Sequence, residues 1–393
     1  MARPTTSPIT TARGAEPVRV EPASGPAGLR TFLEGPFAVY AGDPAWVPPL
    51  FIERNEHLDP KRNPFLKDVE IAYWVARRGG RLVGRISAQV NARHLALHQD
   101  GTGHFGYFDV ADDPEAASAL VDAAAGWLRE RGLARMAGPF DPTINDECGQ
   151  LVDGFASPPV LLMPHGLPHQ PRLLEGLGFA KLQDLIAYRF DVQAPWPAAA
   201  ERLIRRAREL PGLTVRPLDM RRFKDEVRLV CDIFNDAWVG NWGFVPITGE
   251  ESLHLAKGIR PLVDAGHFAI AEMDGEPAAM SVTLPNLNEA IADLGGRLLP
   301  LGWAKLLWRL KVRGVRSGRM PLAGVRRRYQ ASAKGAALIL AAIARVRDYH
   351  RGRGVEWAEL SWILESNVRM NGLIRKVGGV PYKTYRIYGR SIA

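Results

Sequence analysis

The most informative part of this chain runs from Val325 to Ala342 and reads VRRRYQASAKGAALILAA. A short β-like run, Arg319 to Arg326, leads into it, and an apolar helical stretch of Ala, Leu and Ile follows. Small residues at Ala331, Ala333 and Gly335 let a ligand approach the backbone closely. The first turn of the helix offers unpaired N–H groups and the positive end of the helix dipole, which together favour a phosphate. The pattern therefore indicates either an anion-binding joint or an ordinary strand–loop–helix joint whose small residues serve packing.

This loop resembles the acyl-CoA-binding signature of the GNAT acyltransferase superfamily, Gln/Arg-x-x-Gly/Ala-x-Gly/Ala. Gln330, Ala333 and Gly335 match that pattern. The resemblance implies that acyl-CoA binds as a co-substrate, that no cofactor is permanently bound, and that the diphosphate lies on the loop. The binding residues that it implies are Val325, Gln330, Ala331, Ser332, Ala333, Lys334, Gly335 and Ala336, together with Asn367.

A second segment is similar to another signature of the superfamily, Asn-x-x-Ala-x-x-Leu-Tyr-x-Lys-x-Gly-Phe. Asn367, Leu373, Lys376 and Gly378 match it, after a strand-like run at 356–364. Ile374 stands where many relatives have a tyrosine that acts as general acid for the departing thiolate. A thiol has a pKa of about 8.5, so the thiolate can also leave unassisted. The spacing does not choose among the tyrosines that could replace the missing acid, Tyr329, Tyr382 and Tyr385.

Composition describes a folded protein of more than one core. With 393 residues, 46% hydrophobic and 24% charged, the chain is long enough for two domains. Its two cysteines cannot form a disulfide framework, and its nine histidines lack closely paired ligand spacing. We therefore expect a cytoplasmic protein without a catalytic metal. No apolar run approaches the roughly 20 residues that span a bilayer, and residues 1–17 read as a disordered tail without an export signal.

The two halves of the chain repeat one pattern. Strand-like runs at 70–76 and 81–90 flank Gly79-Gly80, and runs at 267–271 and 278–284 flank Asp274-Gly275. Each hairpin is followed by another strand and an apolar helix, at 116–129 and 335–349. We predict an α/β (α+β) fold of two tandem GNAT-like domains, each a mixed, mostly antiparallel twisted sheet flanked by helices. The expected domains are 18–192 and 213–393, joined by a helical linker at 193–212.

The halves also end alike, but their chemistry differs. Leu173–Gly178 precedes Tyr188 by the same spacing with which Leu373–Gly378 precedes Tyr388, which indicates equivalent helix–turn–strand closures. At the helix start that corresponds to the Gln330 loop, the first half has Asp112, Asp113 and Glu115. These carboxylates would repel a diphosphate. We expect only the C-terminal half to bind CoA, while the N-terminal half shapes the acceptor site or serves as scaffold.

A basic amphipathic insertion is predicted at 286–318, and it overlaps a segment from Leu294 to Arg347 that has no acidic residue. The positive charges of this segment outnumber the net charge of the whole chain, which is +9. A local basic face and an anionic partner are therefore expected. The 13 basic residues are Arg297, Lys305, Arg309, Lys311, Arg313, Arg316, Arg319, Arg326, Arg327, Arg328, Lys334, Arg345 and Arg347.

Helical periodicity divides this insertion into two faces. One face is apolar, with Trp303, Leu306, Leu307 and Leu310, and the other is basic, with Lys305, Arg309 and Arg313. Tryptophans on a basic amphipathic helix suit an anionic membrane surface, so peripheral contact with the inner membrane through 297–328 is one expectation. The other is a helix packed on its own domain. Specific nucleic-acid binding is not expected.

The whole chain is similar to a bacterial GNAT-like group that includes bacterial ceramide synthases, with recurrent stretches at 138–148 and 235–245. That resemblance implies an acyl-CoA-dependent N-acyltransferase acting on a long-chain acyl-CoA and the amine of a sphingoid base. Two alternatives stay open. One is an acetyl-CoA-dependent N-acetyltransferase of a small or protein amine. The other is a degenerate GNAT module that binds nucleic acid or membrane.

Amide formation requires a general base, because an alkylamine is mostly protonated at neutral pH. In the superfamily the reaction lies where the strand before the CoA loop parts from the next strand. Glu359, Glu365 and Asp236 are the candidate bases, and Glu359 is favoured. Asn367 either orients the pantetheine or thioester or simply caps its helix.

Overall fold

The computed structural model describes residues 16–393, so most of the tail expected at 1–17 lies outside the described residues. The first half is built from strands and helices that end at Asp191. In chain order they are β1 (Val18–Pro22), α1 (Gly25–Val39), α2 (Phe51–His57), β2 (Val69–Arg78), β3 (Arg81–Asn91), α3 (Ala92–His98), β4 (Thr102–Val110), α4 (Pro114–Arg129), β5 (Arg135–Gly138), β6 (Phe140–Asp141), β7 (Glu147–Cys148), β8 (Gln150–Asp153), α5 (His169–Gly176) and β9 (Ala180–Asp191).

The second half begins with a helix inside the linker predicted at 193–212 and then repeats the order of the first. Its elements are α6 (Ala198–Arg208), β10 (Leu213–Arg216), α7 (Phe223–Trp238), α8 (Gly249–Ile259), β11 (Phe268–Met273), β12 (Glu276–Pro285), α9 (Leu287–Ile291), α10 (Gly302–Trp308), β13 (Ser317–Val325), α11 (Arg327–Gln330), α12 (Ala333–Arg351), β14 (Trp357–Leu364), α13 (Val368–Lys376) and β15 (Val380–Ser391).

Both predicted hairpins are confirmed. β2 and β3 pair antiparallel around Gly79 and Gly80, and β11 and β12 pair around Asp274 and Gly275. All four turn residues have positive φ, a conformation that glycine adopts at no steric cost and aspartate tolerates. The turns could be predicted from the sequence because two-residue hairpin turns require residues that tolerate positive φ.

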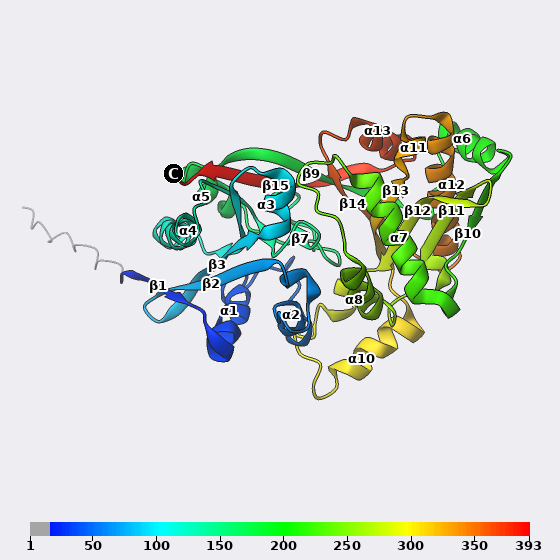
Figure 1. Ribbon diagram of the computed structural model, residues 1–393. Helices are drawn as coiled ribbons and strands as arrows, with labels where there is room; N and C mark the ends of the chain where they lie inside the picture. Colours follow the sequence, from blue (N-terminus) through cyan, green and yellow to red (C-terminus); the bar gives the residue numbers. More distant parts are fainter. Residues whose placement is uncertain (1–15) are drawn as a thin grey trace, which may run out of the picture.

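All the long strands join one sheet, in the order β1-β2-β3-β4-β5-β15-β9-β14-β13-β12-β11-β10, with β8 beside β15. The mostly antiparallel tandem architecture is therefore confirmed, although the two expected sheets are continuous with each other. Figure 1 shows the first half (blue to cyan) on one side and the second (yellow-green to orange) on the other, with β9 and β15 crossing between them.

The strands that close the two halves are exchanged. β9, from the first half, pairs antiparallel with β14, bringing Tyr188 opposite Leu360. β15, from the second half, pairs antiparallel with β5, bringing Tyr388 opposite Gly138. β9 and β15 also pair with each other at the centre of the sheet. Each half is thus completed by the last strand of the other.

Both faces of the sheet are covered by helices. In β11, Ala269 and Ala271 pack under α12, whereas Phe268 and Ile270 pack under α7. The first half repeats this arrangement, with α4 on one face of β2 and β3 and α1 on the other. Such two-sided burial explains why the strands read as nearly continuous apolar runs. Among residues 16–393, no helix is long and apolar enough to cross a membrane.

Candidate functional site

The predicted anion-binding loop lies at the surface, at the start of α12. Residues 331–334 are exposed, and the Ser332 hydroxyl accepts a hydrogen bond from the Gly335 amide at 3.1 Å, which caps the helix. The side-chain amide of Gln330 donates to the carbonyl oxygens of Val325 (3.0 Å) and Ala237 (2.7 Å), so it holds the loop against β13 and α7. The first-turn amides of Ala333 and Lys334 have no carbonyl acceptor within the helix. An anion can approach them from solvent.

Gly335 has a specific steric reason to be glycine. A Cβ atom there would lie 2.1 Å from the carbonyl oxygen of Tyr329, because the chain doubles back between α11 and α12. The close approach sets the direction in which the first-turn amides point. The first turn of α12 contains no acidic residue, so nothing in that turn opposes a phosphate.

The corresponding place in the first half is blocked. Asp113 caps α4 by accepting from the Ala116 amide at 3.0 Å, and Arg78 bonds both Asp113 and Glu115. The chain is also close-packed where β4 and β5 stop pairing, since a Cβ on Gly106 of β4 would lie 1.9 Å from the carbonyl oxygen of Phe140. The carboxylates at the helix start and the close backbone contact beside β4 both disfavour a diphosphate at this place. This geometry supports CoA binding by the second half alone.

β13 and β14 separate immediately beside the loop. They pair in parallel only from Ser317 with Trp357 to Met320 with Leu360. Beyond this point β13 stays with β12, while β14 bulges and continues with β9. The divergence leaves the edges of two parallel strands unpaired, which is the position that the superfamily resemblance assigned to the reaction.

A buried polar cluster lies at this divergence. Glu359 on β14 is fully buried and accepts hydrogen bonds from the hydroxyls of Ser361 and Tyr382. Arg319 on β13 donates from Nε to the Ser361 hydroxyl at 3.1 Å. Lys383, the residue after Tyr382, is also buried. Strands β13, β14 and β15 therefore bring a carboxylate, two hydroxyls and two cations to one place.

Burial sets the protonation of this cluster. It raises the pKa of Tyr382, and the adjacent Glu359 raises it further, so the phenol stays protonated. Burial lowers the pKa of Lys383 to about 8, although Glu359 opposes that change. The buried hydroxyl of Tyr385 has no hydrogen-bond partner within residues 16–393. Chemically, the cluster pairs a proton acceptor, Glu359, with a proton donor, Tyr382.

The other predicted catalytic residues lie outside this cluster. Asp236, on the last turn of α7, accepts from the backbone amide of Arg327 at 2.9 Å and so caps α11. Asn367 caps α13 by accepting from the Met370 amide at 3.1 Å. Glu365, just after β14, accepts a hydrogen bond from Lys181 of β9 at 2.6 Å. For all three, the contacts observed are structural.

The sequence offered uneven signals for the cluster. Glu359 was favoured as the base, and its spacing of two residues from Ser361 places both on one face of a strand. Arg319 was counted with the surface charges, but it is 4% exposed. Tyr382 was one of three tyrosine candidates, and only the fold brings its hydroxyl to Glu359. Ile374 is buried among apolar residues below α13.

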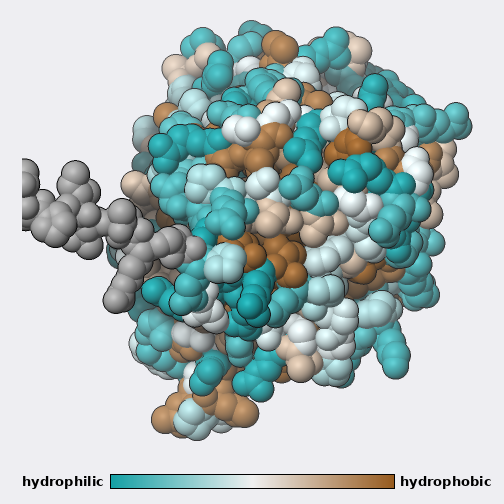
Figure 2. Space-filling model, turned by 90° about the vertical axis from the view of Figure 1, so that its left-hand side faces the viewer, coloured by the Kyte–Doolittle hydropathy of each residue, from teal (hydrophilic) through white to brown (hydrophobic). Residues whose placement is uncertain are grey.

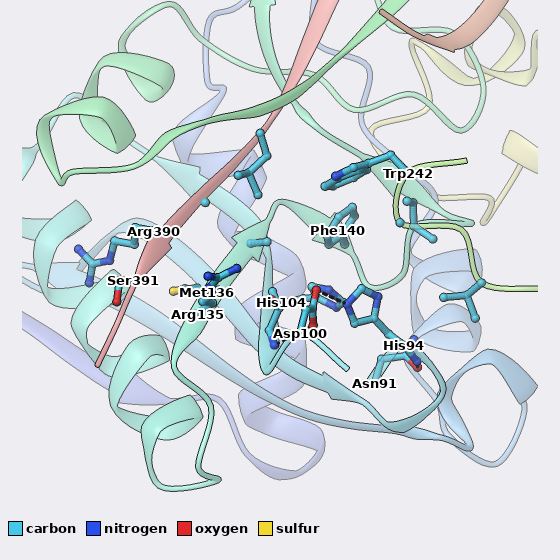
Figure 3. A pocket seen from close by; sticks show the side chains of 17 residues that line it. Asn91, His94, Asp100, His104, Arg135, Met136, Phe140, Trp242, Arg390 and Ser391 are labelled. Carbon is cyan, nitrogen blue, oxygen red and sulfur yellow. Dashed lines mark hydrogen bonds and ion pairs between the residues drawn. The ribbon is translucent and has the colours of Figure 1, made fainter. Parts of the chain in front are cut away.

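A cavity of about 470 Å³, lined by none of the cluster residues, lies between β4 and β5 of the first half and the loop after α7 and β15 of the second. Figure 3 shows its lining side chains, including His94 from α3, Asp100 from the turn between α3 and β4, His104 from β4, and Trp242 from the loop after α7. Burial lowers the pKa of His104 to about 3, so this ring is neutral. Within residues 16–393, no three His, Cys, Asp or Glu side chains are grouped so that they could hold a metal ion.

Two tandem halves, each with splayed parallel strands and a helix that starts at the splay, define a tandem GNAT fold. A tandem GNAT protein from the clavulanic acid biosynthesis pathway, whose structure has been solved, matches this chain with a TM-score of 0.56 at 13% identity. The match covers 96% of this chain and 99% of that protein. No family model matches the sequence.

Two curated proteins resemble the chain along nearly its whole length. The bacterial ceramide synthase of Caulobacter vibrioides is 45% identical over 376 residues, covering 95% of this chain and 97% of that protein. Protein YghO of Escherichia coli is 44% identical over 365 residues, covering 93% of each. The chain belongs to the family of these two proteins, has the tandem GNAT fold and is an acyltransferase.

Proposed function

We propose that this protein transfers a long-chain acyl group from acyl-CoA to the amine of a sphingoid base, forming a ceramide-type amide. The main support for this proposal is the buried Glu359–Tyr382 pair, which lies where β13 and β14 diverge. The exposed start of α12, which follows β13 in the chain, could bind a diphosphate. The name of the Caulobacter relative supports the lipid substrates. The acceptor amine would enter beside the cluster, and acyl-CoA is consumed as co-substrate.

In this proposal, the unprotonated amine attacks the thioester carbonyl and the carbon–sulfur bond breaks. Glu359 takes the proton that the nitrogen loses, and Tyr382 gives its proton to the leaving thiolate. Tyr382 then recovers a proton from Glu359, with which it shares a hydrogen bond. Holding both substrates in the divergence contributes more than either side chain, since positioning alone is worth about 7–11 kcal/mol in favourable cases. Neither Asp236 nor Asn367 touches reacting atoms in this scheme.

We also propose that the insertion contacts an anionic membrane surface. Fewer unpaired basic residues are available for this contact than the sequence predicts. Carboxylates outside the basic run pair with Lys305, Arg309, Arg316, Arg326, Arg327 and Arg328. Arg319 and Arg347 are buried. Sequence distance hid these partners, because the fold brings the carboxylates in from other elements.

The favourable feature of the insertion is its apolar tip, formed by the loop before α10, α10 itself and the π-helical turns that follow. Leu299 is 81% exposed and Leu301 73% exposed. Figure 2 shows hydrophobic residues gathered at the lower end of the molecule. In Figure 1, the loop before α10 is the lowest part of the chain. Lys311 and Arg313 flank the tip, so an anionic bilayer complements it. The remaining exposed residues of the tip are Trp303, Leu307, Trp308 and Val312.

Incubating the purified protein with acyl-CoAs and amines, and identifying amides by mass, tests the proposed activity. Long-chain amides of sphinganine or 3-oxosphinganine are expected. Acetylated small amines as the main product, or stronger thermal stabilisation by acetyl-CoA than by palmitoyl-CoA, would instead favour the acetyltransferase. Binding to random duplex DNA without any CoA affinity would favour the non-enzymatic module.

Sedimentation with lipid vesicles tests the membrane contact. The wild-type protein should pellet with phosphatidylglycerol vesicles more than with phosphatidylcholine vesicles. The double variant Leu299→Ser, Leu301→Ser should bind at least about tenfold more weakly, because each side chain contributes about 1.5 kcal/mol or more when buried. Leu97→Ser, at a 55% exposed leucine on α3, is the matched control. Equal pelleting of both variants would remove the tip from the proposal.

A further inference from the structure

A segment of the first half crosses the site of the second half. Residues 157–163, which we call the strap, lie over the divergence of β13 and β14. Arg319 Nη1 donates to the carbonyl oxygens of Leu161 (3.1 Å) and Leu162 (2.8 Å), while its Nε donates to the Ser361 hydroxyl at 3.1 Å. One buried guanidinium thus connects the strap to the polar cluster.

Side chains from the second half hold the rest of the strap. Lys383 Nζ donates to the carbonyl oxygens of Ser157 (2.7 Å) and Pro158 (3.0 Å). Asn286 accepts from the Leu161 amide at 3.0 Å, and Asn288 donates to the Pro159 carbonyl at 3.0 Å. The distance between the strap and β14 is therefore fixed by long polar side chains. Arg319 and Lys383 thus both belong to the polar cluster and both donate hydrogen bonds to the strap.

The strap has a packed side and an open side. Val160 and Met163 are buried with Tyr385 and Leu364, and Leu161 packs against the core under α7. Leu162 is different, because its side chain is 42% exposed. Its φ of +60° is also rare for leucine, which has no polar group to stabilise that conformation. The grip of Arg319 on two consecutive carbonyl oxygens maintains it.

An acyl chain leaving the divergence has one side available. On the opposite face of β14, Ala358 and Leu360 pack against Leu340 and Ala344 of α12, and this core is closed. The face that carries Glu359 and Ser361 is the face that the strap covers. A thioester placed at Glu359 would therefore direct its acyl chain along the strap.

We propose that the strap is the wall of the acyl site and that Leu162 determines which acyl lengths are accepted. The inference rests on the proposed acyl transfer and assigns to the N-terminal half a part in substrate selection. It also gives a role to the left-handed conformation, which turns the leucine side chain away from the packed side of the strap.

The test compares length profiles, from acetyl-CoA to stearoyl-CoA, for the wild type, Leu162→Trp and Leu162→Gly. Leu162→Trp should shift the preference to shorter chains, with a loss of about fourfold in kcat/KM for each methylene excluded. Leu162→Gly should flatten the profile, and it should fold well because glycine favours positive φ. Affinity for CoA without an acyl group should stay unchanged in both variants. Leu203→Trp, at a 41% exposed leucine on α6, is the matched control.

The outcomes separate this inference from the activity on which it rests. If the wild type acylates amines but the Leu162 variants keep the length profile of the wild type and of Leu203→Trp, the strap does not measure the chain. If the wild type binds no acyl-CoA, the proposed function fails and the inference with it. A parallel loss at all lengths and of free CoA binding would also overturn it, since that pattern means general damage.

Discussion

Replacing Gly335 by alanine should damage the anion-binding loop and the fold together. The new Cβ would lie 2.1 Å from the Tyr329 carbonyl oxygen, whereas an ordinary contact needs about 3.5 Å, so the turn between α11 and α12 must open by about 1.4 Å. Overpacking of this kind costs about 1–3 kcal/mol of folding free energy. A hydrogen bond to a charged group is worth about 1.5–3 kcal/mol. Losing one amide contact to the diphosphate should therefore weaken CoA binding by about tenfold to a hundredfold.

Urea denaturation and calorimetric titration with CoA measure the two effects separately. Gly372→Ala is the matched control, because this glycine lies inside α13 with nothing within 4 Å of an added Cβ. Alanine there should raise the free energy of unfolding by about 1 kcal/mol and leave CoA affinity unchanged. If Gly335→Ala binds CoA as tightly as the wild type and unfolds at the same urea concentration, the steric reasoning about the loop is wrong. The same clash makes larger residues at this position unsuitable as pure tests of charge.

Three further outcomes are expected. Glu359→Gln and Tyr382→Phe should each slow amide formation by about 10²–10⁴-fold while acyl-CoA affinity, measured by titration, changes little; normal rates would exclude the pair as acid and base. Lys334→Glu should weaken CoA binding more at low salt than at high salt, whereas Lys224→Glu, on the exposed first turn of α7, should not, and equal behaviour would argue against the helix-start site. Burial lowers the pKa of His350 to about 3, so below pH 6.5 the unfolded chain binds a proton that the native ring does not bind. The free energy of unfolding should therefore fall by about 1.4 kcal/mol per pH unit down to about pH 3. Urea midpoints of the wild type that fall no faster with pH than those of His350→Gln would contradict this.

Local chemistry made much of the fold predictable. The turns at Gly79-Gly80 and Asp274-Gly275 require residues that tolerate positive φ, so they can be recognised from the sequence alone. The helix start after β13 was predicted because small residues precede an apolar run, and in the structure Ser332 caps α12 there. Such features depend on neighbours within a few positions along the chain.

Features set by distant partners could not be read in the same way. The closing strands of the two halves have the same spacing, so either could complete either sheet, and no local signal specifies the exchange. Arg319 and Lys383 look like surface cations in the sequence, because their carbonyl partners lie more than 150 positions away. For the α10 insertion, the sequence left open whether the apolar face packs on its own domain or contacts a membrane; in the structure Trp303 and Leu307 are exposed, whereas Leu306 and Leu310 are half-buried.

The exchange of β9 and β15 makes the two halves depend on each other during folding. While the chain is being synthesised, the first half would present the bare edge of β5 until the 12 residues of β15, some 250 positions later, have emerged. Contacts of such sequence separation slow folding and leave an unpaired edge open to aggregation in the meantime. Separately produced halves should consequently be poorly soluble alone, yet recover a native core when mixed, because each supplies the strand that the other lacks.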